Sequence, residues 1–265
     1  MTAEVKPVNR KIANTDIFVF GYAPDTDTFT YSRPFSQEEA EGLAKATNTA
    51  IETQYKGATG LRQGLTARDC SLINMSTLKG IVANSVLMDG SQGKRWLPTL
   101  EEGLALHEAG MLAPDVLIDF GTALYDGENP DSKITQAMME TARAKGYETP
   151  VLASFTSLGL SKDGERYGVT PQLVSDKGLI TGQEAVKALE NFRHVGNSGV
   201  RRVYRDDVGN WNADWYVNLD NFYGYCRVGR FSAEGNAKKL REEALGAFAP
   251  IQKSVDTIVS SARSE

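Results

Sequence analysis

Polar and apolar positions recur with helical spacing in several stretches of this 265-residue chain. The clearest stretch is residues 36–53, where one side of a helix would face inward. That side consists of Ala40, Leu43, Ala44, Thr47 and Ile51. Glu39 follows Ser36 by three residues, and a serine and a glutamate at this spacing cap each other's backbone amides. The pattern therefore predicts a helix that begins with a capping box at Ser36.

Other segments have the same period. We expect helices over residues 100–111, 134–146 and 182–194, and two C-terminal helical segments over residues 232–249 and 250–265. Thr99 with Glu102, and Thr181 with Glu184, repeat the capping pair at the start of the first and third of these segments. The inward face of the third consists of Ala185, Val186, Leu189 and Phe192.

Strand patterns lie on both sides of these helices. Residues 16–23 and 29–35 are rich in aromatic and β-branched side chains and are separated by Pro, Asp and Thr, which predicts an N-terminal hairpin. Residues 116–124 and 150–158 predict two strands that flank the helix at 134–146. A strand–helix–strand unit of this kind favours parallel pairing through a right-handed crossover.

The pattern changes between residues 199 and 231, where residues 211–220 alternate strictly between apolar and polar or outward-facing positions. Trp211, Ala213, Trp215, Val217 and Leu219 alternate with Asn212, Asp214, Tyr216, Asn218 and Asp220. With the segments before and after, this pattern predicts a three-stranded antiparallel meander. Residues 55–95 instead mix glycines with short apolar runs, and predict only loops with a short helix or strand around residues 78–88.

These elements define an α+β fold. It has a mixed sheet with one strand–helix–strand unit, an N-terminal hairpin and a C-terminal antiparallel aromatic meander, packed with about five helices. Neither an internal repeat nor a low-complexity linker interrupts the chain, so we expect a single domain over residues 1–265. The composition changes near residues 196–199, where a sub-boundary before the meander would fall, and residues 250–265 form the C-terminal helix.

Composition narrows the classes of function. The net charge of −5 argues against a protein that coats duplex nucleic acid, because phosphate neutralisation requires a basic face. Cys70 and Cys226 do not form a CxxC motif, and they favour a reduced, cytoplasmic chain without a disulfide. The N-terminal segment lacks the apolar core of an export signal, and no segment approaches the roughly 18 apolar residues that span a bilayer. We therefore expect neither export nor membrane insertion.

Asp119, Phe120 and Gly121 resemble the metal-binding tripeptide of protein kinases. A kinase also needs a His-Arg-Asp loop, an asparagine for the second metal, a phosphate-binding lysine and a glycine-rich lid, and this chain lacks that set. Phosphatases with an aspartate nucleophile at a strand end need a second aspartate two residues later, where this chain has Gly121. Asp119 is therefore expected to be a polar residue of a core strand. Asp119 and Asp126 are the minority candidates for catalysis at that strand's carboxyl end.

His107 and His194 are the only histidines, which restricts acid–base chemistry and histidine-rich metal sites. His107 lies on an apolar helical stripe and His194 at the end of a predicted helix, so both are expected to be structural. The Walker, GxGxxG, HExxH and GxSxG motifs are absent from the sequence. We expect no metal site and no cofactor.

Arginine and aromatic residues are concentrated between residues 200 and 231. The candidate binding residues are Arg201, Arg202, Tyr204, Arg205, Tyr216, Tyr223, Tyr225, Arg227 and Arg230. On an exposed sheet face, such side chains bind single-stranded nucleic acid or form a protein hot spot. The simpler interpretation is that Trp211 and Trp215 face the core beneath the helices while Tyr216 faces outward.

The sequence favours a non-catalytic binding or assembly protein that self-associates or binds a protein partner. Its binding surface would be the aromatic and arginine-rich sheet face, with the C-terminal helix as a second candidate surface. Two alternatives stay open: a single-stranded nucleic-acid-binding protein that uses the same face, and a small hydrolase or transferase with Asp119 at a strand end. We expect no membrane partner.

Overall fold

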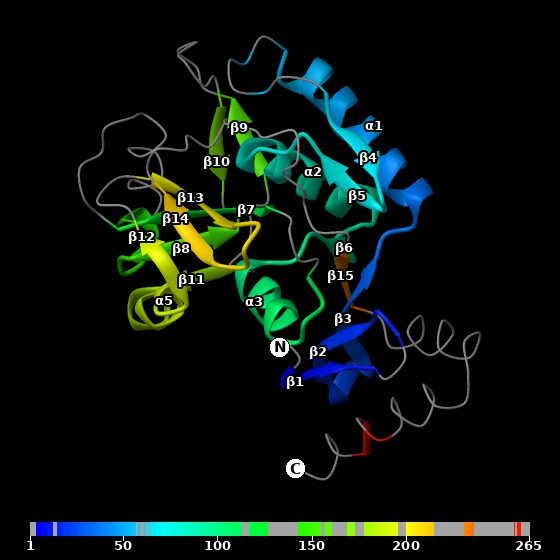
Figure 1. Ribbon diagram of the computed structural model, residues 1–265, viewed down its shortest axis with the longest axis vertical. Coiled ribbons are helices and arrows are strands. Elements are labelled where there is room, and N and C mark those ends of the chain that lie inside the picture. Colours follow the sequence, from blue (N-terminus) through cyan, green and yellow to red (C-terminus); the bar gives the residue numbers. More distant parts are fainter. Residues whose placement is uncertain are drawn as a thin grey trace.

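The computed structural model describes residues 4–12, 15–56, 58, 61, 64–112, 117–126, 143–154, 157–160, 169–172, 178–195, 200–214, 231–235, 257 and 259–260. Helices and several sheets, one of them mixed, make up this part of the chain, which confirms the expected α+β class (Figure 1). None of the described helices has the length and apolar character needed to cross a membrane.

One sheet has five strands, in the order β1-β2-β3-β15-β6. These strands are β1 (Lys6–Lys11), β2 (Phe18–Ala23), β3 (Thr28–Pro34), β15 (Phe231–Gly235) and β6 (Arg95–Trp96). All of its pairs are antiparallel. The predicted N-terminal hairpin is confirmed as β2 and β3, joined by the short 3-10 helix Pro24–Thr26. β15 comes from near the other end of the chain and lies between β3 and β6.

The second large sheet has six strands, in the order β11-β8-β7-β13-β14-β12. They are β11 (Leu179–Thr181), β8 (Val151–Ser154), β7 (Ile118–Tyr125), β13 (Val200–Arg205), β14 (Trp211–Asp214) and β12 (Phe192–Val195). β12 and β14 are parallel, and the other pairs are antiparallel. Two small ladders are β4 (Thr66–Arg68) with β5 (Ser71–Ile73), and β9 (Ser157–Leu160) with β10 (Val169–Gln172).

The predicted parallel crossover is wrong, because β7 and β8 pair antiparallel. Tyr125 at the end of β7 lies opposite Val151 at the start of β8, so the chain returns to the same end of the sheet at which it left. A connection of this length can reach either end of the neighbouring strand, and strand periodicity carries no information about which end it reaches. Of the helix expected over residues 134–146, residues 134–142 lie outside the described ranges, and residues 143–145 are helical.

The predicted meander is right for its first pair of strands, since β13 and β14 form an antiparallel pair. Residues 215–230 lie outside the described part of the chain, and Phe231 begins β15 in the other large sheet. The helix expected over residues 232–249 is wrong at its start, because residues 232–235 pair with β3 as a strand, and residues 236–249 lie outside the described residues. β12 is the second neighbour of β14. It occupies the end of the segment expected to be helical, because α5 (Gly182–Leu189) ends before Phe192. Thr181 precedes α5 but its side chain makes no capping hydrogen bond, so that predicted capping box does not form.

Three helices position the core. α1 (Gln37–Gln54) and α3 (Leu100–Glu108) both begin with the predicted capping boxes. α2 (Thr77–Gly90) lies between α1 and β7 (Figure 1). The first half of α2 is buried on every side. A helix without a polar face has no amphipathic period, which is why the sequence predicts this region poorly.

Candidate functional site

The adjacent strands β7 and β13 bring the acidic and basic candidate residues together. Asp119 lies within β7 and Asp126 immediately after it, while Arg201, Arg202 and Arg205 lie on β13. From the sequence, Asp119 is expected to be a polar residue of a core strand, the two aspartates are only minority candidates for catalysis, and the three arginines are candidate binding residues. In the folded chain, the aspartates pair with two of the arginines.

Asp119 sits in a β-bulge. Val203 pairs with Thr122 and Arg205 pairs with Ile118, so residues 119–121 of β7 lie opposite a single residue of β13. A bulge of this kind disrupts the ladder and redirects a side chain. The Asp119 Oδ1 atom accepts a hydrogen bond from the backbone N–H of Gly121 at 2.7 Å. The local geometry of the Asp-Phe-Gly tripeptide is therefore that of a bulged core strand.

The Asp119 carboxylate joins three elements. Its Oδ2 atom accepts hydrogen bonds from Nε of Arg202 at 2.5 Å and from Oγ1 of Thr77, at the start of α2, at 2.8 Å. Both Asp119 and Arg202 are 0% exposed. The Arg202 guanidinium also lies 5.3 Å from the ring centroid of Tyr204. This ion pair is thus fully desolvated, and it ties β7 and β13 to α2.

Arg201 and Arg205 also have internal partners. Arg201 is 1% exposed and pairs with Asp126. Arg205 is buried and donates from Nε to Nδ1 of His107 on α3 at 3.1 Å. Burial, and then the nearby Arg205 charge, lower the pKa of His107. His107 therefore accepts this hydrogen bond as a neutral imidazole, which suits the structural role expected for it.

The described part of the predicted binding surface is not an open face. Arg201, Arg202 and Arg205 are buried, and Tyr204 is half-buried. The core interpretation is confirmed at Trp211, which is 2% exposed. The other predicted binding residues, Tyr216, Tyr223, Tyr225, Arg227 and Arg230, lie outside the described residues, as does Trp215. His194 lies on β12 and not at a helix end.

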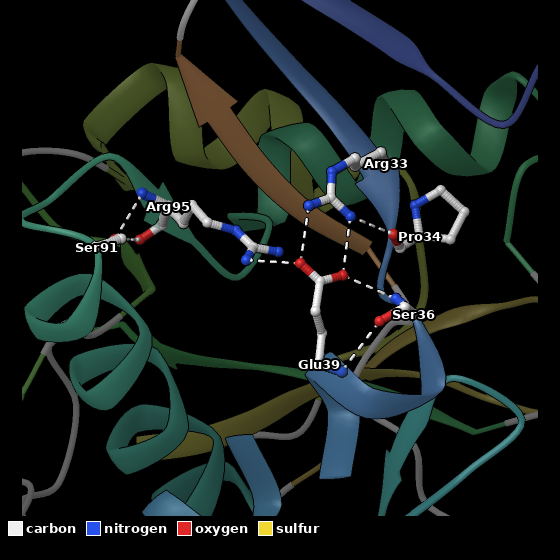
Figure 2. Close-up of polar contacts among 6 residues, drawn as sticks. All are labelled: Arg33, Pro34, Ser36, Glu39, Ser91 and Arg95. Atoms are coloured by element: carbon white, nitrogen blue, oxygen red, sulfur yellow. Dashed lines mark hydrogen bonds and ion pairs between the residues drawn. The ribbon is translucent and has the colours of Figure 1, made fainter. Parts of the chain in front are cut away.

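A second polar cluster, which the sequence did not reveal, surrounds Glu39 (Figure 2). The Glu39 carboxylate accepts two hydrogen bonds from Arg33 of β3, at 2.8 and 2.9 Å, and one from Arg95 of β6 at 2.9 Å. It also accepts the backbone N–H of Ser36 at 2.8 Å. The hydrogen bonds from Arg33 are the main cause that lowers the pKa of Glu39 to about 2, against the opposing effect of burial. We call Arg33, Glu39 and Arg95 the Glu39 clasp.

The sequence predicted the position of Glu39 in this clasp, but not its arginine partners. The capping box predicted that Glu39 would turn back toward Ser36. The arginines could not be assigned, because they reach Glu39 from two strands that are not paired with each other. Glu102 of the second capping box has a comparable role, since it accepts hydrogen bonds from the indole Nε1 of Trp96 at 3.1 and 3.3 Å.

The described clusters bind elements of the chain to one another. Carboxylates that accept several charged hydrogen bonds are stabilised in their ionised form and fix the geometry of their donors. Among the described residues, no three His, Cys, Asp or Glu side chains converge in a way that would hold a metal ion. Comparison with models of protein families, with curated protein sequences and with solved structures finds no match to this chain. The fold and these ion pairs therefore define it as an α+β protein with charged pairs inside its core.

Proposed function

We propose that the protein is a non-catalytic binding or assembly protein, and that it associates with a second copy of itself. The proposed contact is the outer edge of the six-stranded sheet, formed by β12 and α5. The observation that carries the proposal is Val195, which is 36% exposed on β12, a strand at the edge of that sheet. This surface replaces the arginine-rich face, because the described arginines of that face are buried.

The edge itself supports strand addition. Among the described strands, β12 pairs with β14 alone. The far side of an edge strand presents backbone N–H and C=O groups that can pair with another chain. Soluble proteins commonly protect such an edge with proline or charged side chains; β12 contains no proline, and its one acidic or basic side chain apart from His194 is the exposed Arg193.

α5 adds apolar surface next to this edge. The period of the segment predicted that Val186 would face inward, but its side chain is 45% exposed, while the neighbouring Ala185 is fully buried. α5 packs against β12, so both exposed valines lie on contacting elements. Burial of these apolar side chains in a contact would contribute favourable free energy of association.

Charge favours a second copy as the partner. α5, β12 and the turn between them have four exposed charged residues: Glu184, Lys187, Glu190 and Arg193. Two are acidic and two are basic, so the surface is compatible with its own copy across a two-fold axis. A surface with charges of one sign would repel itself.

The buried ion pairs support the non-catalytic part of the proposal. Asp119, the residue on which a hydrolase would depend, has no exposed surface and has three hydrogen-bond donors within the chain. A nucleophile or general base must reach its substrate. Asp119 instead satisfies polar groups of the core.

Light scattering during size-exclusion chromatography tests the proposal over a range of protein concentrations. The mass of the wild-type chain should rise toward that of a dimer, and Val195→Lys and Val186→Lys should each weaken association by about tenfold or more, because each places a charge in an apolar contact. The matched control is Val5→Lys, at a valine that is 57% exposed beside β1 in the other large sheet. A wild-type chain that stays monomeric at every concentration contradicts the proposal, as does equal association of all variants.

Size-exclusion chromatography in the presence of a single-stranded oligonucleotide tests the alternative that the protein binds single-stranded nucleic acid. Co-elution at low salt that disappears at moderate salt would support that alternative, because phosphate contacts release counterions. We expect no co-elution, since the described arginines of the proposed face are engaged inside the fold.

A further inference from the structure

Strand β15 fills a slot between β3 and β6. It forms five antiparallel register pairs with β3, from Phe231 opposite Pro34 to Gly235 opposite Thr30. On its other side, Ala233 and Glu234 pair with the two residues of β6. β15 is therefore hydrogen-bonded along both edges, although it follows β14 of the other large sheet in the chain.

The β6 wall of this slot is held by contacts that do not involve β15. Arg95 binds Glu39 of α1, and the indole of Trp96 binds Glu102 of α3. Two further side chains bind the backbone of residues 95–97: one lies within α2, and the other belongs to the residue that follows its C-terminal end. Ser91 Oγ accepts the N–H of Arg95, and Asn84 Oδ1 accepts the N–H of Leu97, both at 2.9 Å. Three helices thus fix the position of β6.

The Glu39 clasp connects the two walls of the slot directly. Arg33 belongs to β3 and Arg95 to β6, which are the two neighbours of β15. Figure 2 shows β15 passing behind the Glu39 carboxylate, between the two arginines that bind it. The clasp therefore closes over one face of β15 and keeps its neighbours at the spacing that a strand requires.

We infer that the space between β3 and β6 is a strand acceptor, and that β15 of a second copy fills it in the assembled protein. This inference rests on the proposed self-association, but it uses a different surface from β12 and α5. An exchanged β15 makes the same backbone hydrogen bonds as the chain's own strand, so exchange loses none of the ladder. The balance between the two forms is then set by protein concentration against the effective concentration of the chain's own β15.

Disulfide trapping between separate full-length chains tests this inference. Ser32 of β3 and Ala233 of β15 are register partners, and cysteine replaces either with little change in volume. One chain carries Ser32→Cys and a differently tagged chain carries Ala233→Cys, both with Cys70→Ser and Cys226→Ser. After mixing and mild oxidation, exchange yields a disulfide-linked heterodimer whose yield rises with concentration.

A second mixture controls for random collision. It pairs the Ser32→Cys chain with a chain that carries Thr49→Cys, at an exposed position of α1. The inference is overturned if the Ser32→Cys and Ala233→Cys chains give no more heterodimer than this control, while a chain with both cysteines closes its disulfide internally. The internal disulfide shows that the register pair is competent to react.

The clasp supplies an independent readout. Glu39→Gln removes the ionised acceptor that bridges the walls, so heterodimer should form about tenfold faster than with intact Glu39. The matched control is Glu41→Gln on the exposed side of the same helix, which should leave the rate unchanged. An unchanged rate in Glu39→Gln would remove the clasp from the inference.

This result is separable from that of the β12 edge. If light scattering shows a dimer that Val195→Lys disrupts, but no heterodimer is trapped, the strand-exchange inference fails and the proposed function stands. If no association is seen by either method, both fail.

Discussion

Asp119 shows how a single residue can resemble a catalytic group and have a structural role. The tripeptide that it begins matches a metal-binding motif, yet its carboxylate accepts hydrogen bonds from α2, from β13 and from its own bulge. Burial of a charged pair is costly unless every polar atom finds a partner. The three donors satisfy the Asp119 carboxylate, and the same contacts remove it from solvent.

Replacement of Asp119 by asparagine should therefore reduce stability strongly. Asp119→Asn leaves the buried Arg202 guanidinium without its counter-charge, and the expected loss is about 3–5 kcal/mol of unfolding free energy. Urea denaturation measures this loss, with Asp207→Asn on the exposed β13–β14 turn as the control, expected to change stability by less than about 0.5 kcal/mol. A double variant, Asp119→Leu with Arg202→Met, should recover much of the loss because it removes both charges. A loss in Asp119→Asn as small as that in the control would contradict the structural role.

The elements of the fold differ in how far their sequences predict them. α1 and α3 were predicted with their capping boxes, because a cap depends on residues three positions apart. For α2, the sequence predicted only a short helix or strand around residues 78–88, because the first half of this helix is buried on every side and has no amphipathic pattern. The helix predicted over residues 182–194 ends at Leu189, where the chain forms β12 beside β14. The helical spacing of apolar residues continues to Phe192, although residues 192–195 pair with β14 as a strand.

The contact between β7 and α2 leads to a prediction at Gly121. Its φ is +73°, and a Cβ atom there would lie 3.3 Å from the backbone of Gly80 and Ile81 in α2. Gly121→Ala should therefore destabilise the fold by about 2 kcal/mol or more, since both the left-handed backbone and the close contact oppose a side chain. Gly42→Ala is the control, because Gly42 is exposed within α1 and has open space around it. It should raise stability by about 0.5–1 kcal/mol. Thermal unfolding of the two variants measures both effects, and equal melting temperatures would contradict the packing of β7 on α2.

At the scale of the whole molecule, ion pairs between distant segments join the layers. Arg202 lies 83 residues from Asp119 along the chain, and Arg95 lies 56 residues from Glu39. β15, a strand from near the C-terminus, adds to this by joining β3 to β6 within the five-stranded sheet. Contacts of such sequence separation are formed only when the chain is folded, so they make global stability sensitive to the ionisation of the groups involved.

The pH dependence of unfolding tests this coupling through Glu39. The pKa of Glu39 is lowered from 4.5 to about 2 in the folded chain, so its contribution to stability is fully present above about pH 4.5 and is lost as the pH falls toward 2. The contribution corresponds to at most about 3 kcal/mol. Urea unfolding at several pH values should show Glu39→Gln less stable than the wild type at pH 7, with the difference closing at acid pH, whereas Glu41→Gln should follow the wild type. A difference that stays constant with pH would show that the loss in Glu39→Gln is not electrostatic.

The sequence predicts the burial of some candidate-site residues but not of others. The alternation around Trp211 predicted a core-facing position, and burial confirms it. The same alternation could not show that Arg201 and Arg202, on opposite faces of β13, would both be buried. A strand pattern identifies two faces, but it does not show that both are covered.

The sequence by itself determined the α+β class, the N-terminal hairpin and the capped starts of α1 and α3, because these depend on residues close together in the chain. Only the tertiary structure decided that β7 and β8 run antiparallel, that β15 enters the five-stranded sheet, and that Asp119 pairs with Arg202, Asp126 with Arg201 and Glu39 with Arg95. The physical reason is that charge pairing and strand pairing join segments far apart in sequence. Their partners are selected by the packed fold, and the local period of hydrophobic residues does not encode that choice.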